Sequence, residues 1–337
     1  MHRRKFLKKA SAFGSGLLLS PTLMNGAITS VISSKPPRLR YGDKIGVITP
    51  GSALSRQGFS EALENISQLG FEPVPATYAN QKYGFLGGTD FQRISDFHEV
   101  FRNDEIKGVI CARGGYGSGR ILADLDYSLI RQNPKVFIGY SDITTLLNMI
   151  YQKAGLICFH GPVGGSDFTD FTRKKFYETV VEGRPFVLQS RDGYTIRKGQ
   201  ASGKLAGGNL SLITALTGTK NEINFDRKIV FIEEVQESPY RIDRMLTQLI
   251  ASGKLKNARG IAFGKFASCD VKLTDPLYEE KFKLTQVLAD RCSNLSIPVY
   301  YGFDFGHVPD NATLPVGLKV LFDADAGTMR AVEPAVS

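Results

Sequence analysis

The sequence predicts an α/β fold: an N-terminal α/β domain with a parallel sheet, followed by a second, smaller, β-rich C-terminal domain. Over the first half of the chain, short apolar runs rich in β-branched residues alternate with stretches of helical periodicity. This alternation is typical of parallel strands joined by crossover helices. In the second half the apolar runs are short and glycine turns are frequent, which favours a β-rich domain. With 337 residues, 42% of them hydrophobic, the chain can form two modest cores.

Three strand–turn–helix units support the N-terminal domain. The run KIGVITP at 44–50 is followed by the helical pattern FSEALENISQLGF at 59–71. The run GVICA at 108–112 leads into the turn RGGYGSG and the helix-like RILADL, and in VFIGYSDITTLLNMIYQ a strand ends near Gly139. In this third unit we expect the side chain of Asp142 to cap the helix. Loops at the carboxyl ends of such strands usually hold the functional site.

Changes of pattern divide the chain into four segments. We expect an export signal and linker at 1–35, the α/β domain at 36–165, a linker at 166–184 and the β-rich domain at 185–330. Polar stretches such as DFTRKKF interrupt the apolar rhythm in the third segment, which is why it is interpreted as a linker.

The N-terminal residues have the composition of an export signal. HRRKFLK at 2–8 precedes ASAFGSGLLLSPTLM at 10–24, which is too short and too rich in glycine and serine to span a bilayer as a stable helix. Paired arginines before such a stretch resemble a twin-arginine signal, which predicts export to the periplasm. The net charge of the chain is +9, and five of its lysine and arginine residues lie within the first nine positions. The remaining lysines and arginines are scattered along the chain. Such a distribution argues against a nucleic-acid-binding surface.

The four cysteines do not follow a metal-binding pattern. They lack a CxxC pair and a histidine at ligand spacing, so we expect no metal site. Cys111 and Cys158 adjoin apolar residues, which favours buried thiols over disulfides.

Ser141 is the first candidate for chemistry. In FIGYSDIT it lies where a strand turns into a helix, so its hydroxyl would project above the edge of the sheet. The spacing is not GxSxG, and the pattern alone also fits a plain helix N-cap. In RGGYG at 113–117 the glycines allow the backbone to present N–H donors to an oxyanion. A phosphate-binding loop is disfavoured there because GK[ST] and GxGxxG are absent.

An acid and a base come from later in the chain. The apolar run IVFIEEV contains Glu233 and Glu234 where its strand ends, and a carboxylate in that position can orient a histidine ring. After the signal only three histidines remain. His98 lies in a polar helix-like stretch and is expected at the surface, and His160 lies between apolar residues and is expected in the core with its hydrogen bonds satisfied. His307 follows GFDFG in a loop rich in glycine, proline and aspartate, where a catalytic base is usually displayed.

Several motifs in order resemble those of the LD-carboxypeptidase family, which includes the microcin-immunity peptidases. They are RGGYG, GYSDIT, GGNLS, IEEV with SPYRIDRML, and DFGH with LPVG, and the resemblance spans about 42–325. It implies a triad in which Ser141 is the nucleophile, His307 the base and Glu233 the acid that orients the base. Glu234 stands where many members have aspartate, so the choice between the two acids stays open.

The resemblance also implies an oxyanion hole, a substrate and an assembly. The hole would use the backbone N–H of Asp142 and that of Gly114 or Gly115. The substrate would be a murein tetrapeptide, cleaved by a serine carboxypeptidase at the LD-peptide bond that releases terminal D-Ala, and the protein would be a homodimer without a cofactor. Detoxification of peptide-nucleotide antibiotics is the alternative among enzymes. A non-catalytic module that binds murein peptides is the alternative outside them.

Overall fold

The first half of the chain forms a parallel sheet, as the sequence predicts. The computed structural model describes residues 33–270 and 282–337, and in these the first sheet has six strands in the order β12-β5-β4-β3-β1-β2. The parallel strands are β1 (Lys44–Ile48), β2 (Glu72–Pro75), β3 (Ile106–Cys111), β4 (Val136–Gly139) and β5 (Cys158–His160). Their order is that of doubly wound sheets, in which ligands bind beyond the carboxyl ends of the strands. Residues 1–32, most of the expected export signal, lie outside the described residues.

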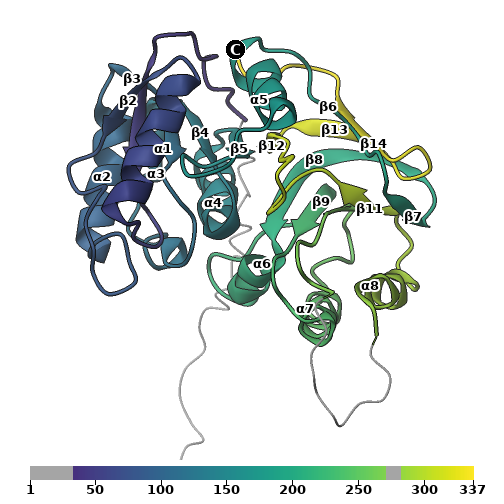
Figure 1. The fold of residues 1–337 in the computed structure, drawn as a ribbon. Coiled ribbons are helices and arrows are strands. Elements are labelled where there is room, and N and C mark those ends of the chain that lie inside the picture. The colour runs from purple at the N-terminus through teal and green to yellow at the C-terminus, as the bar shows by residue number, and fades with distance from the viewer. Residues whose placement is uncertain (1–32, 271–281) are drawn as a thin grey trace, which may run out of the picture. The chain divides into compact units, whose positions relative to one another are not determined.

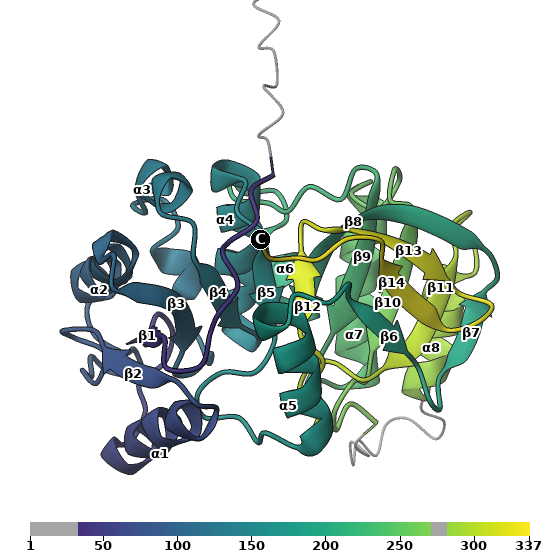
Figure 2. The ribbon, with the colours of Figure 1, turned by 90° about the horizontal axis from the view of Figure 1, so that it is seen from above.

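Helices cover both faces of the first sheet. Figure 2 shows α1 and α5 on one side and α2, α3 and α4 on the other. Their bounds are α1 (Arg56–Gln68), α2 (Asp90–Arg102), α3 (Tyr127–Gln132), α4 (Thr144–Ala154) and α5 (Asp170–Phe176). The hydroxyl of Ser55 accepts the N–H of Gly58 to start α1, and Thr89 forms a capping box with Gln92 at the start of α2.

The expectation that Asp142 caps α4 is wrong. The residue before the helix is Ile143, which makes no side-chain cap. The Asp142 carboxylate instead accepts the backbone N–H of Ser118 at 2.7 Å. A buried N–H needs an acceptor, and this contact between two loops therefore takes precedence over a local cap.

The second half of the chain forms a mixed sheet. In the described residues it has eight strands in the order β6-β14-β13-β8-β9-β10-β11-β7, with four central parallel strands and antiparallel pairing outside them. The strands are β6 (Val187–Gln189), β7 (Tyr194–Arg197), β8 (Gln200–Asn209), β9 (Lys228–Glu233), β10 (Gly260–Gly264), β11 (Val299–Phe303), β13 (Lys319–Asp323) and β14 (Thr328–Ala331). Figure 1 shows that α6 (Leu210–Leu216), α7 (Pro239–Ala251) and α8 (Leu284–Cys292) lie along one side of this sheet.

The segment expected to be a linker is partly helical. Residues 166–184 contain α5 and a π-helical turn, η3 (Tyr177–Val181). Residues Val31–Ser337 form one compact unit, and the domain limits at 165 and 185 stay a prediction.

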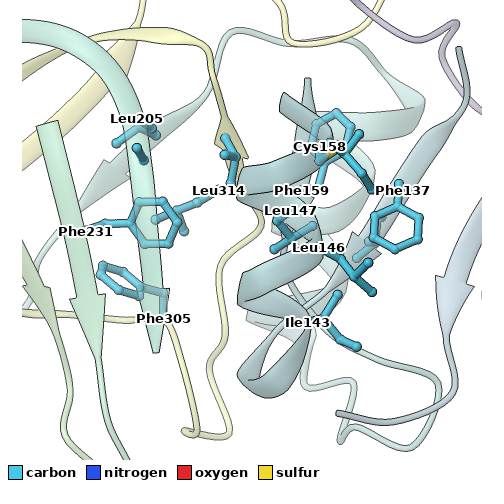
Figure 3. Close-up of a cluster of buried hydrophobic side chains, with 14 of the residues drawn as sticks. Phe137, Ile143, Leu146, Leu147, Cys158, Phe159, Leu205, Phe231, Phe305 and Leu314 are labelled. Atoms are coloured by element: carbon cyan, nitrogen blue, oxygen red, sulfur yellow. The ribbon is translucent and has the colours of Figure 1, made fainter. Parts of the chain in front are cut away.

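One strand from the end of the chain returns to the first sheet. β12 (Leu314–Val316) pairs antiparallel with β5, so that Leu314 is opposite His160. Figure 3 shows Leu314 between Phe231 of the second sheet and Leu147 of α4. All three side chains are fully buried. The apolar core is therefore continuous between the two sheets.

Helix α4 is also hydrogen-bonded to the second sheet. The Asn148 side chain donates to the Gly207 carbonyl at 2.8 Å and accepts the Gly207 N–H at 3.1 Å. The Thr144 hydroxyl accepts the N–H of Asn209 at 3.0 Å. Gly207 has a φ of 143°, and a Cβ there would collide with the Phe231 carbonyl. Close packing of backbones therefore requires glycine at this position.

The cysteine side chains lie inside the protein. The four cysteines are buried and unpaired, as expected, and burial raises the pKa of each thiol. In the described part of the chain no helix is long and apolar enough to cross a membrane.

Candidate active site

Ser141 occupies a strained turn directly after β4. Its φ is 63°, and it opens the short 3-10 turn η2 (Ser141–Ile143) that precedes α4. A non-glycine residue with positive φ is uncommon, and such strain gathers at functional sites. Because Ser141 is the first residue of η2 and the residue before α4 is Ile143, with no side-chain cap, the plain N-cap interpretation does not fit. The half-buried Ser141 has the backbone form of a nucleophile elbow.

The RGGYG turn, which follows β3, lies directly against this elbow. A Cβ built on Gly114 would lie 2.9 Å from Ser141 Cβ and 3.2 Å from the backbone nitrogen of Asp142. Glycine is thus required for the approach of the two loops. Gly115, with a φ of 87°, faces Ser52, and the Ser52 hydroxyl accepts the N–H of Tyr116 at 3.0 Å. Gly114 therefore lies next to the serine elbow, whereas Gly115 lies next to Ser52 of the loop after β1.

Two buried side chains hold the turn in place. Asp142 is 1% exposed; it accepts the Ser118 N–H, and its carbonyl accepts the Ser118 hydroxyl at 2.6 Å. Burial raises the pKa of the Asp142 carboxyl, and the bonds from Ser118 oppose the rise. Arg93 of α2, equally buried, donates to the carbonyls of Pro50 and, at 2.8 Å, Gly117. The role of Arg93 was not visible in the sequence, where it lies in an ordinary amphipathic helix.

Glu233 and His307 form a hydrogen-bonded pair in the second half of the chain. Glu233, at the end of β9, is fully buried, and its Oε2 lies 2.7 Å from His307 Nδ1. His307 is 19% exposed and lies in the loop after β11. Burial lowers the pKa of His307, but the hydrogen bond to Glu233 and the charges of Glu233 and Glu234 outweigh it, and the pKa is raised. Such a pair is a base with its orienting acid.

The residue before Ser141 connects the elbow to this pair. The rings of Tyr140 and His307 meet edge to face with centroids 4.9 Å apart. Ser141 and His307 therefore lie on neighbouring loops from the two halves of the chain. No hydrogen bond joins the hydroxyl of Ser141 to the ring of His307, both of which are described residues. Catalytic hydrogen bonds are often long without substrate.

Glu234 belongs to a different network. Its Oε1 accepts from the side chain of Asn209 and from the N–H of Val235, both at 2.9 Å. Its Oε2 accepts from the N–H and hydroxyl of Ser211 at 2.8 and 2.7 Å. The motif GGNLS thus supplies partners for this acid, a connection that sequence reasoning missed because the two segments lie apart in the chain.

The other two histidines differ from each other. Nε2 of His98 accepts the N–H of Asp126 at 2.9 Å, and the residue is partly exposed at the surface. His160 is fully buried, as expected, but neither of its ring nitrogens has a hydrogen-bond partner. The expectation of a satisfied core histidine is therefore wrong. Within residues 33–270 and 282–337, no cluster of three His, Cys, Asp or Glu side chains could hold a metal.

Family models match both halves of the chain. The model of the LD-carboxypeptidase N-terminal domain matches residues 45–161, and that of the LD-carboxypeptidase C-terminal domain matches residues 202–321. The chain belongs to the LD-carboxypeptidase family. Membership in this family makes the protein a carboxypeptidase, and therefore a hydrolase.

Individual LD-carboxypeptidase relatives are similar over nearly their full length. The probable murein peptide carboxypeptidase of Bacillus subtilis is 39% identical over 313 residues, which are 91% of this chain and 96% of the relative. The microcin C7 self-immunity protein MccF of Escherichia coli is 28% identical, over 89% of this chain and 96% of its own. The solved structure of muramoyltetrapeptide carboxypeptidase from Oxalobacter formigenes is 32% identical, with a TM-score of 0.75 over 86% of this chain and 99% of that one.

Proposed function

We propose that this protein is a serine carboxypeptidase that cleaves the LD-peptide bond releasing terminal D-Ala from murein tetrapeptides. One observation carries the proposal. The Glu233–His307 pair lies beside a strained elbow that presents Ser141, with the backbone of Gly114 packed against it. A nucleophile, a base with its acid, and N–H donors are the parts that acyl transfer requires.

The reaction would proceed in two steps. His307 takes the proton of the Ser141 hydroxyl as the oxygen attacks the carbonyl carbon of the L-configured centre. The N–H groups of Asp142 and of Gly114 or Gly115 would hold the oxyanion, and the C–N bond breaks as His307 returns the proton to the amine of D-Ala. Water then attacks the ester carbon as His307 takes its proton. The bond to the Ser141 oxygen breaks, His307 returns the proton to that oxygen, and the shortened peptide leaves. Glu233 keeps Nδ1 protonated, so that Nε2 is free to act as base.

The relatives support the choice of substrate. The probable murein peptide carboxypeptidase of Bacillus subtilis is similar in sequence over 91% of this chain, and the muramoyltetrapeptide carboxypeptidase of Oxalobacter formigenes is similar in structure over 86% of it. The similarity to MccF favours a second candidate, a peptidase that inactivates peptide-nucleotide antibiotics. The third candidate is a module that binds murein peptides without catalysis. The hydrogen-bonded pair of Glu233 and His307 argues against it, because a binding protein does not need an oriented base.

Product analysis separates these candidates. The purified protein is incubated with a panel of muropeptides and with a peptidyl nucleotide, and products are identified by mass spectrometry. We expect loss of D-Ala from tetrapeptides and labelling of Ser141 by a fluorophosphonate. Ser141→Ala and His307→Ala should each lower kcat by on the order of 10³-fold or more, and the double variant should be scarcely worse than either. A correctly folded Ser141→Ala variant that kept its activity would contradict the serine mechanism.

We also propose export to the periplasm and a homodimer. The proposal of export rests on Arg3 and Arg4 of the HRRKFLK segment. The proposal of a homodimer rests on the resemblance to the family. Replacing both arginines by lysine should leave the protein in the cytoplasm; unchanged periplasmic fractionation would contradict the twin-arginine signal. Light scattering measures the mass of the assembly, and a monomer at micromolar concentration would contradict the dimer.

A further inference from the structure

A second histidine faces the oxygen of Glu233 that His307 does not use. His160 Nε2 lies 4.0 Å from Glu233 Oε1, and both residues are fully buried. Neither atom has a hydrogen-bond partner, and Nδ1 of His160 has none either. Buried polar atoms are nearly always paired, so unpaired atoms that face each other require an explanation.

The position of His160 is fixed by the backbone. It ends β5, where it is opposite Gly139 of β4 on one side and Leu314 of β12 on the other. Gly139 precedes Ser141 by two residues. The same strand end therefore lies between the nucleophile elbow and the acid of the triad.

The ring of His160 is enclosed by other aromatic rings. Tyr140, Phe231 and Phe305 meet it edge to face at centroid distances of 6.1, 5.2 and 6.1 Å. Phe231 and Phe305 offer no hydrogen bond, whereas the Glu233 carboxylate places an acceptor 4.0 Å from Nε2.

His160 is neutral near pH 7. Burial lowers its pKa to about 4, although the charge of Glu233 acts in the opposite direction. A neutral imidazole still carries one N–H. Closing the gap from 4.0 Å to an ordinary N–H···O distance requires a movement of about 1 Å.

We propose that His160 is a positioning residue whose Nε2–H donates to Glu233 Oε1, so that the carboxylate is held at both oxygens and keeps the ring of His307 aligned. This inference rests on the proposed serine mechanism, in which Glu233 orients the base. His160 does not touch the substrate. It acts through Glu233, as outer partners of functional side chains commonly do.

A hydrogen bond from His160 to Glu233 should affect the pKa of His307. A donor on Oε1 takes up part of the negative charge of Glu233, so its removal should strengthen the attraction between Glu233 and protonated His307 and raise the pKa of His307. Two other titratable groups act on this pair: Glu234, whose charge also raises the pKa of His307, and Tyr140, whose ring contacts both histidines. Neither is changed in the test below.

The test compares His160→Phe with His160→Gln. Phenylalanine fills the aromatic enclosure without an N–H, and glutamine retains a donor. For His160→Phe we expect kcat on a murein tetrapeptide to fall about tenfold with little change in KM. The acidic limb of the kcat/KM profile should move to higher pH by about half a unit. His160→Gln should recover most of both values. Thermal unfolding of each variant serves as the control for folding.

A second readout does not depend on substrate. NMR titration of the His307 ring, in the wild type and in both variants, measures its pKa directly. A raised pKa in His160→Phe and a normal one in His160→Gln supports the positioning role even if murein peptides prove not to be substrates. An unchanged pKa in a folded His160→Phe variant overturns the inference. Equal loss of activity in both variants, with lowered thermal stability and no change in the pKa, also overturns it, because His160 would then be needed only for packing.

Discussion

Glu233 and Glu234 are adjacent in the chain, yet their carboxylates belong to separate hydrogen-bond networks. Glu233 bonds to the ring of His307, and Glu234 accepts four hydrogen bonds from Asn209, Ser211 and Val235. Successive side chains at a strand end point to opposite sides, which separates the two acids. The geometry therefore favours Glu233 as the acid that orients the base.

Substitution of each acid by its amide tests this difference. Glu233→Gln should lower kcat by about 10²-fold, because an amide cannot stabilise the protonated ring. Glu234→Gln should change kcat much less but lower the free energy of unfolding by about 1–3 kcal/mol, because its NH₂ group would face donors. Steady-state kinetics and urea unfolding measure the two effects. Severe loss of turnover in a stable Glu234→Gln variant, with a mild effect of Glu233→Gln, would reverse the assignment.

The pH dependence of kcat/KM should show a base with a raised pKa. His307 must be neutral to accept a proton, so activity is lost as pH falls through its pKa, which lies above the ordinary value of 6.5. In Glu233→Gln the hydrogen bond to a carboxylate is absent and burial dominates, so the midpoint should move to lower pH. Rates measured between about pH 5 and pH 9 check both expectations. A wild-type midpoint below 6.5 would contradict the role of the Glu233–His307 pair.

Gly114→Ala should impair catalysis more than folding. The new Cβ would lie 2.9 Å from Ser141 Cβ and 3.0 Å from the carbonyl oxygen of Tyr140, so the elbow or the turn must shift. Since a misplacement of about 1 Å can cost 10²-fold, we expect kcat to fall at least about tenfold. Gly119→Ala is the matched control, because its Cβ would only touch Thr145 at 4.0 Å. Equal kcat in the two variants would show that the approach of the turn to Ser141 is not needed.

Asp96→Asn should stabilise the protein at neutral pH. Asp96 lies buried on α2, where burial raises the pKa of its carboxyl to about 7, the N–H of Tyr78 lowers it and the charge of Glu99 raises it. The unfolded chain loses this proton near the ordinary value of 3.8, so the stability of the wild type falls as pH rises from there to about 7. The variant lacks this dependence and should be more stable by on the order of 2 kcal/mol at pH 8, but not at pH 4. Urea unfolding at both pH values measures the difference in the free energy of unfolding between the variant and the wild type. An equally large increase at pH 4 would show that the effect does not come from the ionisation of Asp96.

Local patterns predicted the first sheet but not its full extent. The alternation of apolar runs with helical patterns identifies β1, β3 and β4. The helix expected at RILADL is wrong: residues 121–124 form turns, and the α-helix after β3 is α3, which begins at Tyr127. β12 is only three residues long and lies in the chain between β11 and β13 of the second sheet, so nothing in its neighbourhood indicates that it pairs with β5. Pairings between distant segments depend on tertiary packing and leave no local signal.

In the candidate site, too, local sequence signals identified some residues, whereas contacts between distant segments could not be predicted. Ser141 and His307 lie in loops whose glycines and turn residues mark them, and the family resemblance linked them to Glu233. The carboxylate of Asp142 and the ring of His160 were misjudged, because their environments are made by segments far away in the chain. Sequence patterns identified side chains with suitable chemistry, and only the folded structure shows the atoms they face.

The return of β12 to the first sheet has a consequence for biosynthesis. Until Leu314–Val316 leave the ribosome, β5 is an edge strand with unpaired backbone groups, and the apolar surface that Leu314 covers is exposed. The first sheet therefore cannot be completed before Leu314–Val316 are made, although its other strands are made earlier. A nascent chain that stops before this point leaves the edge of β5 open and would be a substrate for chaperones and proteases.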